Sequence, residues 1–143
     1  MSIKTIALQV MRALGLFAGV RWMTRHRLRI LCYHAGCDGD QDRFNPKLFC
    51  RSEHIERRLT WLRQAGFTPM SLDDAVAALR GHRPLPALPV VLTVDDGWAS
   101  SRRDIIDVAL SRGYPITLYV ATEVLMAQVP VVDVTVRYLL WKS

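Results

Sequence analysis

Two adjacent carboxylates, Asp95 and Asp96, follow the apolar run Pro89–Val94 and stand directly before Gly97. Neighbouring side chains on an extended backbone point to opposite sides, so the two carboxylates can perform different tasks. One can hold a divalent cation, and the other can take a proton from a water on that cation, whose pKa falls from about 15.7 to about 7. Asp-Gly is also a frequent turn sequence, so the alternative is that the pair only closes a strand.

A second group of chemically capable side chains ends the stretch Leu28–His34, which closes with Cys-Tyr-His. Histidine is a common general acid in enzymes, so His34 can serve in that role; the alternative is a polar residue that caps a strand. Cys32 and His34 share one face of the predicted strand, and Cys37 follows closely, which would suit a soft metal ion. Free cysteines are common in protein cores, so an ordinary structural role is the competing interpretation.

Strands and helices must position these side chains. Apolar runs flanked by Gly, Pro and Asp predict strands at 28–34, 67–70, 90–94 and 115–121, of which the first and third are expected to be buried. Helical spacing predicts helices over about 46–64, 72–80 and 100–112, and the residues from 129 onward fit either type. Alternating strands and helices predict a parallel sheet, at whose carboxyl edge His34 and the two aspartates would meet.

The charge of the 143 residues is distributed unevenly. The net charge is +6, but residues 1–30 hold six basic and no acidic side chains, so the remainder of the chain is neutral. A nucleic-acid-binding protein more often carries its positive charge on a folded face between exposed aromatic residues, so we expect no nucleic-acid partner. Half of the residues are hydrophobic, which indicates a globular protein. The three cysteines show no disulfide spacing, which indicates reduced thiols.

Residues 1–26 form a basic arm, which we distinguish from a domain at 27–143. Apolar residues recur in the arm at three- and four-residue steps, which predicts an amphipathic helix. Its longest uncharged run, 13–20, is shorter than the roughly 20 residues that span a bilayer. The arm therefore either lies on the inner face of an anionic membrane or packs against protein. The expected localisation is cytoplasmic or peripheral to that membrane face.

Several sequence blocks, in this order, resemble the polysaccharide deacetylase family with a NodB homology domain. The blocks are LCYH, LTWLRQAGFTPMSLDDAVAAL, VVLTVDDGW and YPITLYVAT, and they extend over about residues 28–125. The family motif is Thr-Phe-Asp-Asp-Gly, and here Val94 replaces its aromatic residue. The resemblance implies an α/β fold, the N-terminal half of a distorted (β/α) barrel that is incomplete in this chain. It also implies a metal-dependent hydrolase that removes acetyl groups from an N-acetylated glycan.

The family pattern, carried onto this chain, makes Asp95 the general base, Asp96 a metal ligand with zinc the expected metal, and His34 the general acid. Trp98 stands where the family often has an aromatic residue, so it either lines the sugar cleft or belongs to the core. The family adds two metal-binding histidines after the aspartates, but all four histidines of this chain precede them. We therefore expect a truncated enzyme, inactive alone. The alternative is a non-catalytic remnant that binds carbohydrate or associates with a membrane.

Overall fold

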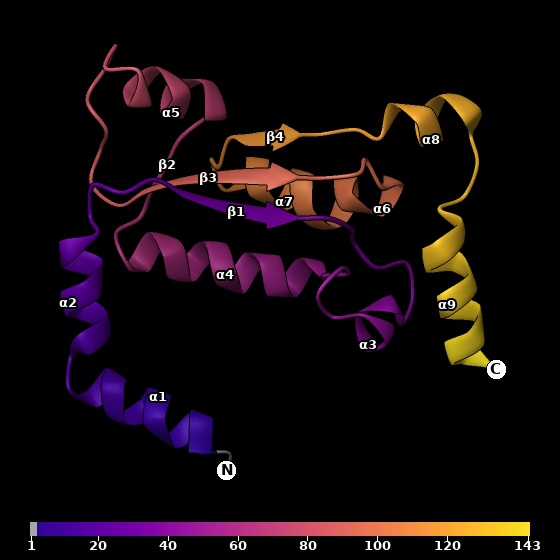
Figure 1. Ribbon diagram of the computed structural model, residues 1–143, viewed down its shortest axis with the longest axis horizontal. Coiled ribbons are helices and arrows are strands. Elements are labelled where there is room, and N and C mark those ends of the chain that lie inside the picture. The colour runs from indigo at the N-terminus through magenta and orange to yellow at the C-terminus, as the bar shows by residue number, and fades with distance from the viewer. Residues whose placement is uncertain (1–2) are drawn as a thin grey trace.

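The computed structural model describes residues 3–143. Within them, four strands form a parallel sheet, β1 (Arg29–Tyr33), β2 (Thr68–Pro69), β3 (Pro89–Val94) and β4 (Ile116–Leu118). β1 pairs along one edge of β3, and β2 and β4 pair with successive parts of the other edge (Figure 1). β3 is thus the central strand, and all six of its residues are buried.

The helical segments of the described residues are α1 (Ile3–Ala13), α2 (Leu16–Met23), α3 (Gln41–Phe44), α4 (Ser52–Gln64), α5 (Leu72–Leu79), α6 (Ala99–Ser101), the π-helical η1 (Arg102–Ile106), α7 (Asp107–Ser111), α8 (Thr122–Ala127) and α9 (Val132–Lys142). The sheet is covered on one face by helices that include α4 and on the other by α5. The main core lies on one face, where Ile55 of α4 packs with Leu92 of β3 and Ile105 of η1. On the other face, Ala75 of α5 packs with Val91.

The two strands that lead to the candidate residues are parallel, as predicted, and the structure makes them direct neighbours, with Tyr33 paired to Val94. The expectation that β1 is fully buried is wrong, because Ile30 is 53% exposed. β3 is paired on both edges, whereas the described residues pair β1 on one edge alone. The other edge of β1 borders a pocket that Trp61 of α4 also lines. β1 is therefore an edge strand of the sheet.

The helix expected over about 46–64 begins only at the start of α4. Residues 46–48 form a turn instead, in which the backbone N–H groups of Leu48 and Phe49 donate to the carbonyl of Asn45 at 3.1 and 3.0 Å. Phe49 then forms an isolated bridge with Ala35. The spacing of Leu48 and Phe49 matched that of apolar residues on one face of a helix. In the structure both side chains instead pack in a small cluster that contains Ala35.

The arm contains two helices rather than the single helix expected. α1 and α2 meet at Gly15, which has a φ of 69°, and the two helices are bent by 69°. Neither helix contains a buried residue, and the pair projects from the sheet (Figure 1). Among residues 3–143 no single helix is long and apolar enough to cross a membrane, although this bent pair passes the same test by length and composition. Residues 1 and 2 of the arm lie outside the described residues.

The residues from 129 onward, whose sequence fitted either a strand or a helix, contain the helix α9. α9 packs against α3, where the rings of Phe44 and Tyr138 meet edge-on at 5.6 Å. Asp40, just before α3, accepts hydrogen bonds from Lys142 at 2.7 Å and from the hydroxyl of Tyr138. These bonds, the one from Lys142 above all, lower the pKa of Asp40 to about 2. The carboxylate is therefore ionised at neutral pH and fastens α9 to the loop that follows β1.

α5 begins with a side-chain cap at Ser71, whose hydroxyl accepts a hydrogen bond from the N–H of Asp74 at 3.0 Å. The Ser-x-x-Asp spacing predicts this contact. Replacing Ser71 with alanine is expected to lower the free energy of unfolding by about 1 kcal/mol, because a helical N–H loses its partner. Urea unfolding followed by circular dichroism measures the change. Ser52→Ala is the matched control, since α4 has no side-chain cap, and an equal loss in both variants would contradict the assignment.

Candidate active site

The candidate active site lies at the carboxyl edge of the sheet, where β1 and β3 end. Side chains alternate along a strand, so Tyr33 and Val94 point into the core that α4 covers. Cys32 and Asp95, one position away on each strand, point to the opposite face and touch there. His34 follows Tyr33 and returns to that same face. The alternation of two parallel strands thus brings together side chains that are about sixty residues apart in sequence.

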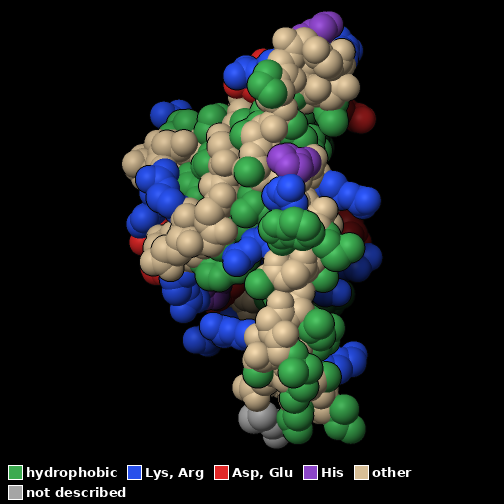
Figure 2. Space-filling view, turned by 90° about the vertical axis from the view of Figure 1, so that its left-hand side faces the viewer, with side chains coloured by type: hydrophobic (Ala, Val, Ile, Leu, Met, Phe, Trp, Pro, Cys, Tyr) green, Lys and Arg blue, Asp and Glu red, His purple; other side chains and the backbone are tan. Residues whose placement is uncertain are grey.

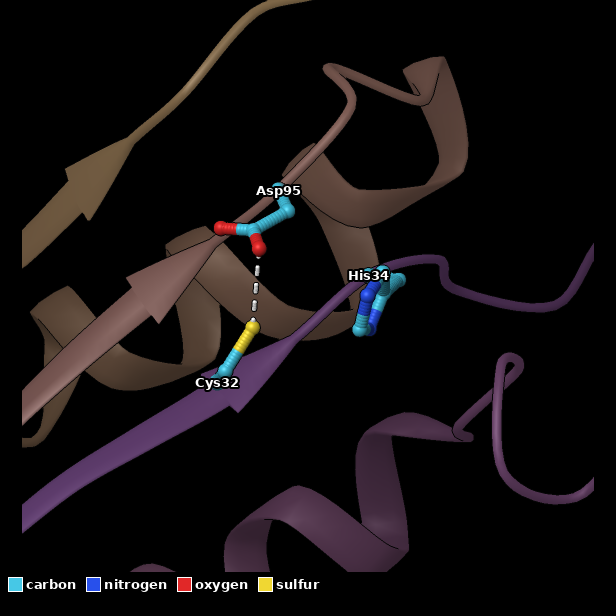
Figure 3. A group of neighbouring side chains, drawn as sticks. All are labelled: Cys32, His34 and Asp95. Atoms are coloured by element: carbon cyan, nitrogen blue, oxygen red, sulfur yellow. Dashed lines mark hydrogen bonds between the residues drawn. The ribbon is translucent and has the colours of Figure 1, made fainter.

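Cys32, His34 and Asp95 form one cluster at this edge (Figure 3). One ligand atom from each residue lies within 4.8 Å of the other two. The thiol of Cys32 donates a hydrogen bond to Oδ2 of Asp95 at 3.1 Å. Partial burial, and then this hydrogen bond, raise the pKa of the Cys32 thiol. Cys32 is exposed and the other two residues are half-buried, so solvent and solutes can reach the cluster.

The sequence grouped Cys37 with Cys32 and His34, and the structure corrects this grouping. Cys37 is buried with Phe49 in a separate cluster beside the loop that follows β1. The chain turns inward after His34, so the thiol of Cys37 faces the protein interior rather than the sheet edge. Asp95 takes the third place in the cluster.

Asp96 lies on the other side of the turn. It has a φ of 70°, in the left-handed region that aspartate adopts more readily than most residues, and Gly97 follows with a φ of 75°. This turn brings the Asp96 carboxylate to Trp98, whose ring N–H donates a hydrogen bond to Oδ2 at 3.3 Å. The two adjacent carboxylates therefore have separate surroundings, Asp95 among strand-end side chains and Asp96 beside an aromatic ring.

A pocket opens on the Asp96 side of the turn. Its lining is apolar apart from Asp96 and includes Trp98 together with Val134 of α9. Trp98 is half-buried, and its ring meets Phe49 edge-on at a centroid distance of 5.8 Å. Trp98 thus packs against a small core on one side and borders this pocket on the other. The C-terminal helix, whose type the sequence left open, supplies part of the pocket wall.

Two residues that hold the loop after His34 were not recognised from the sequence. Asp104 of η1 is 5% exposed and accepts hydrogen bonds from the backbone N–H of Cys37 at 2.8 Å and from Nε of Arg103 at 2.7 Å. Arg103 also donates to the carbonyl of Cys37 at 2.7 Å. The bond from Arg103 lowers the pKa of Asp104, which keeps this carboxyl charged. No local spacing pointed to Asp104, because its backbone partner is 67 residues away.

The parallel sheet, its covering helices and the polar groups at its carboxyl edge define the class of fold. It is part of a (β/α) barrel of the NodB deacetylase type, and solved deacetylases share it. The Streptococcus pyogenes deacetylase PplD, at 20% identity, aligns with a TM-score of 0.59 over 71% of this chain and 45% of its own.

Relatives with higher identity agree with this assignment. Poly-β-1,6-N-acetyl-D-glucosamine N-deacetylase of Escherichia coli (strain K12) is 42% identical over 50 residues, which are 35% of this chain and 7% of that protein. The structure of IcaB from Ammonifex degensii is 28% identical, with a TM-score of 0.56 over 65% of this chain and 37% of its own. No protein-family profile matches the sequence. The chain thus contains part of a NodB-type deacetylase fold, and it spans a small fraction of the curated relative.

Proposed function

We propose that this chain carries the acid–base part of a metal-dependent glycan N-deacetylase site. The observation that carries the proposal is the meeting of His34 and Asp95 at the ends of neighbouring parallel strands, with ligand atoms within 4.8 Å of each other. Such strand ends are where this class of fold places its chemistry. The curated relative is named for its action on poly-β-1,6-N-acetyl-D-glucosamine, which supports an N-acetylated glucosamine polymer as the substrate class.

The two residues divide the proton transfers of amide hydrolysis between them. Asp95 accepts a proton from the water that attacks the acetamide carbonyl. His34, in its protonated form, donates a proton to the nitrogen of the sugar, which then leaves as an amine. Their half-buried position leaves room for a glycan to approach from solvent.

The metal centre that the family pattern implies is not completed by the described residues. Asp96 is exposed and offers carboxylate oxygen, a ligand that zinc accepts. Within residues 3–143, however, no group of three metal-binding side chains includes Asp96. Zinc sites normally use three or four protein ligands, so one carboxylate holds the ion weakly. We therefore propose that the 143 residues alone are inactive and that further ligands come from outside them.

A chimera tests the proposal. Residues 28–125 would replace the corresponding segment of the Escherichia coli relative, whose remaining segments would supply the metal-binding histidines of the family pattern. We expect the chimera, with added zinc, to release acetate from N-acetylated glucosamine oligomers, and the isolated chain to release none. A folded chimera that binds zinc but releases no acetate would refute the proposal.

The second candidate function is a non-catalytic glycan-binding remnant. The incomplete ligand set around Asp96 and the apolar pocket beside Trp98 favour it. This candidate predicts that the isolated chain binds N-acetylated glucosamine oligomers in the absence of metal, and that Trp98→Ala weakens the binding. Calorimetric titration with a chelator present measures both, and tight binding together with an inactive chimera would place this candidate first.

We further propose that the arm of residues 1–26 lies on an anionic membrane surface, at the cytoplasmic face. Eleven large hydrophobic side chains between residues 3 and 23 are exposed, among them Trp22 at 66% and Met23 at 75%. The same segment carries basic and no acidic side chains. Figure 2 shows hydrophobic and basic side chains together on the part that projects from the sheet. Apolar side chains beside cations are the pattern of helices that lie in a membrane interface.

The double variant Arg12→Gln/Arg21→Gln is expected to bind vesicles containing phosphatidylglycerol about 30-fold more weakly, because each basic residue contributes about 1 kcal/mol near an anionic surface. Co-sedimentation with vesicles measures the affinity. Arg57→Gln/Arg80→Gln removes two exposed charges elsewhere and should leave it unchanged. Equal binding by both double variants, or equal binding to uncharged vesicles, would contradict the membrane proposal.

A further inference from the structure

We propose that Cys32, His34 and Asp95 form a binding site for a thiophilic divalent cation such as Zn²⁺, separate from the metal expected at Asp96. The three residues offer sulfur, nitrogen and carboxylate oxygen, which are the three kinds of protein ligand that zinc accepts. One ligand atom from each lies within 4.8 Å of the other two (Figure 3). Among residues 3–143 they are the one group of three metal-binding side chains that meets this distance.

The existing contact between Cys32 and Asp95 is close to the geometry of two zinc ligands. With Zn–S at about 2.3 Å and Zn–O at about 2.0 Å, sulfur and oxygen in a tetrahedral site are about 3.5 Å apart. The Sγ and Oδ2 atoms are 3.1 Å apart here, joined by the thiol proton. A cation that replaces this proton needs the two atoms to separate by only a few tenths of an ångström. The proton goes to solvent, and the thiolate becomes the ligand.

The backbone holds the three ligands in register. Tyr33 pairs with Val94, and the N–H of Asp95 donates to the carbonyl of Tyr33 at 2.9 Å, which extends the strand pairing to the residue that carries the carboxylate. Cys32 lies on β1 next to Tyr33, and His34 directly follows the last residue of the strand. The site therefore rests on paired strand ends rather than on a free loop, and such supports keep ligands near a fixed geometry.

Charge and access fit a divalent cation. A thiolate and a carboxylate carry two negative charges, which a divalent ion neutralises, and His34 binds as the neutral imidazole. Cys32 is exposed, so a solvated ion reaches the cluster and keeps water as a fourth ligand. Asp96 is excluded from this site because its turn brings its carboxylate to Trp98.

Occupancy of this site has a consequence that rests on the proposed function. The cation takes the atoms with which Asp95 accepts and His34 donates protons, so excess zinc or cadmium inhibits the deacetylation that a metal at Asp96 supports. Binding of the cation itself does not depend on the chain being an enzyme. Cation binding at this site and deacetylase activity can therefore each be refuted without refuting the other.

The test is a titration of the reduced 143-residue chain with Co²⁺, which reports a bound thiolate through sulfur-to-cobalt charge-transfer absorption. We expect this absorption to saturate at one ion per chain. Cys32→Ser should abolish it, and His34→Gln and Asp95→Asn should each weaken the affinity at least about tenfold. Cys37→Ser is the matched control, since Cys37 is buried away from the cluster, and it should leave the absorption unchanged.

Three outcomes would overturn the proposal. Absorption that survives Cys32→Ser places the ion on another thiol, and the absence of absorption in the folded chain means that no thiolate site forms. Asp96→Asn distinguishes the sites, because it should not change the cobalt spectrum. Loss of the spectrum in that variant would assign the ion to the Asp96 centre. Circular dichroism of each variant verifies that it is folded before the titration is interpreted.

Discussion

Asparagine in place of Asp95 is expected to reduce acetate release by the zinc-loaded chimera by about 10²–10⁴-fold, the range in which a general base contributes. The amide cannot take the proton from the attacking water. Its Oδ1 can still accept the thiol hydrogen bond from Cys32, which is 3.1 Å from the carboxylate now, so the strand ends should keep their structure. Acetate release measured against substrate concentration gives the loss in kcat/KM.

Asp96→Asn is the control that separates the two carboxylates. A weakened metal ligand lowers the occupancy of the site, and a higher zinc concentration restores occupancy by mass action. In a chimera that also carries Cys32→Ser, and therefore lacks the proposed inhibitory site, part of the activity of Asp96→Asn should return as zinc is added. Asp95→Asn in the same background should stay inactive at every zinc concentration. Full activity in Asp95→Asn, or recovery of that variant by zinc, would show that Asp95 is not the base.

The sequence predicted the central relationship of the candidate site because a general rule governs it. Parallel strands end at one edge of a sheet, so His34 and Asp95 were expected to meet there, and they do. Strand alternation also predicted that Asp95 and Asp96 would face different surroundings. The actual separation depends on the left-handed φ of Asp96, which a sequence pattern does not specify.

Other features depend on contacts between distant segments, and local patterns do not contain these contacts. Phe49 fitted a helical period, but its bridge to Ala35 decides its conformation. Cys37 looked like a third ligand by proximity in the chain, yet the charged Asp104 draws its backbone N–H inward at 2.8 Å. β1 was predicted to be buried from its composition, and its place at the sheet edge exposes Ile30.

The loop after His34 is held so close to its neighbours that Gly36 has no room for a side chain. A Cβ atom on Gly36 would lie 2.3 Å from the carbonyl oxygen of Ser100 and 2.7 Å from Oδ2 of Asp104. Both neighbours are held in place, since the hydroxyl of Ser100 donates to the carbonyl of Gly36 at 3.1 Å and Asp104 holds the next N–H along the loop. A methyl group therefore cannot be accommodated without moving α6, η1 or the loop.

Gly36→Ala is expected to lower the free energy of unfolding by about 3 kcal/mol, at the upper end of the usual cost of overpacking, because the new methyl meets backbone. Urea unfolding followed by circular dichroism measures the loss. Gly39→Ala, in the same loop, is the matched control, because the nearest atom to its Cβ would be Oε1 of Gln41 at 3.7 Å, and it should change the stability little. Equal free energies of unfolding in the two variants would mean that the loop can move to accept the methyl group at little energetic cost. It would also mean that the contacts of Asp104 do not hold the loop after His34 in a fixed position.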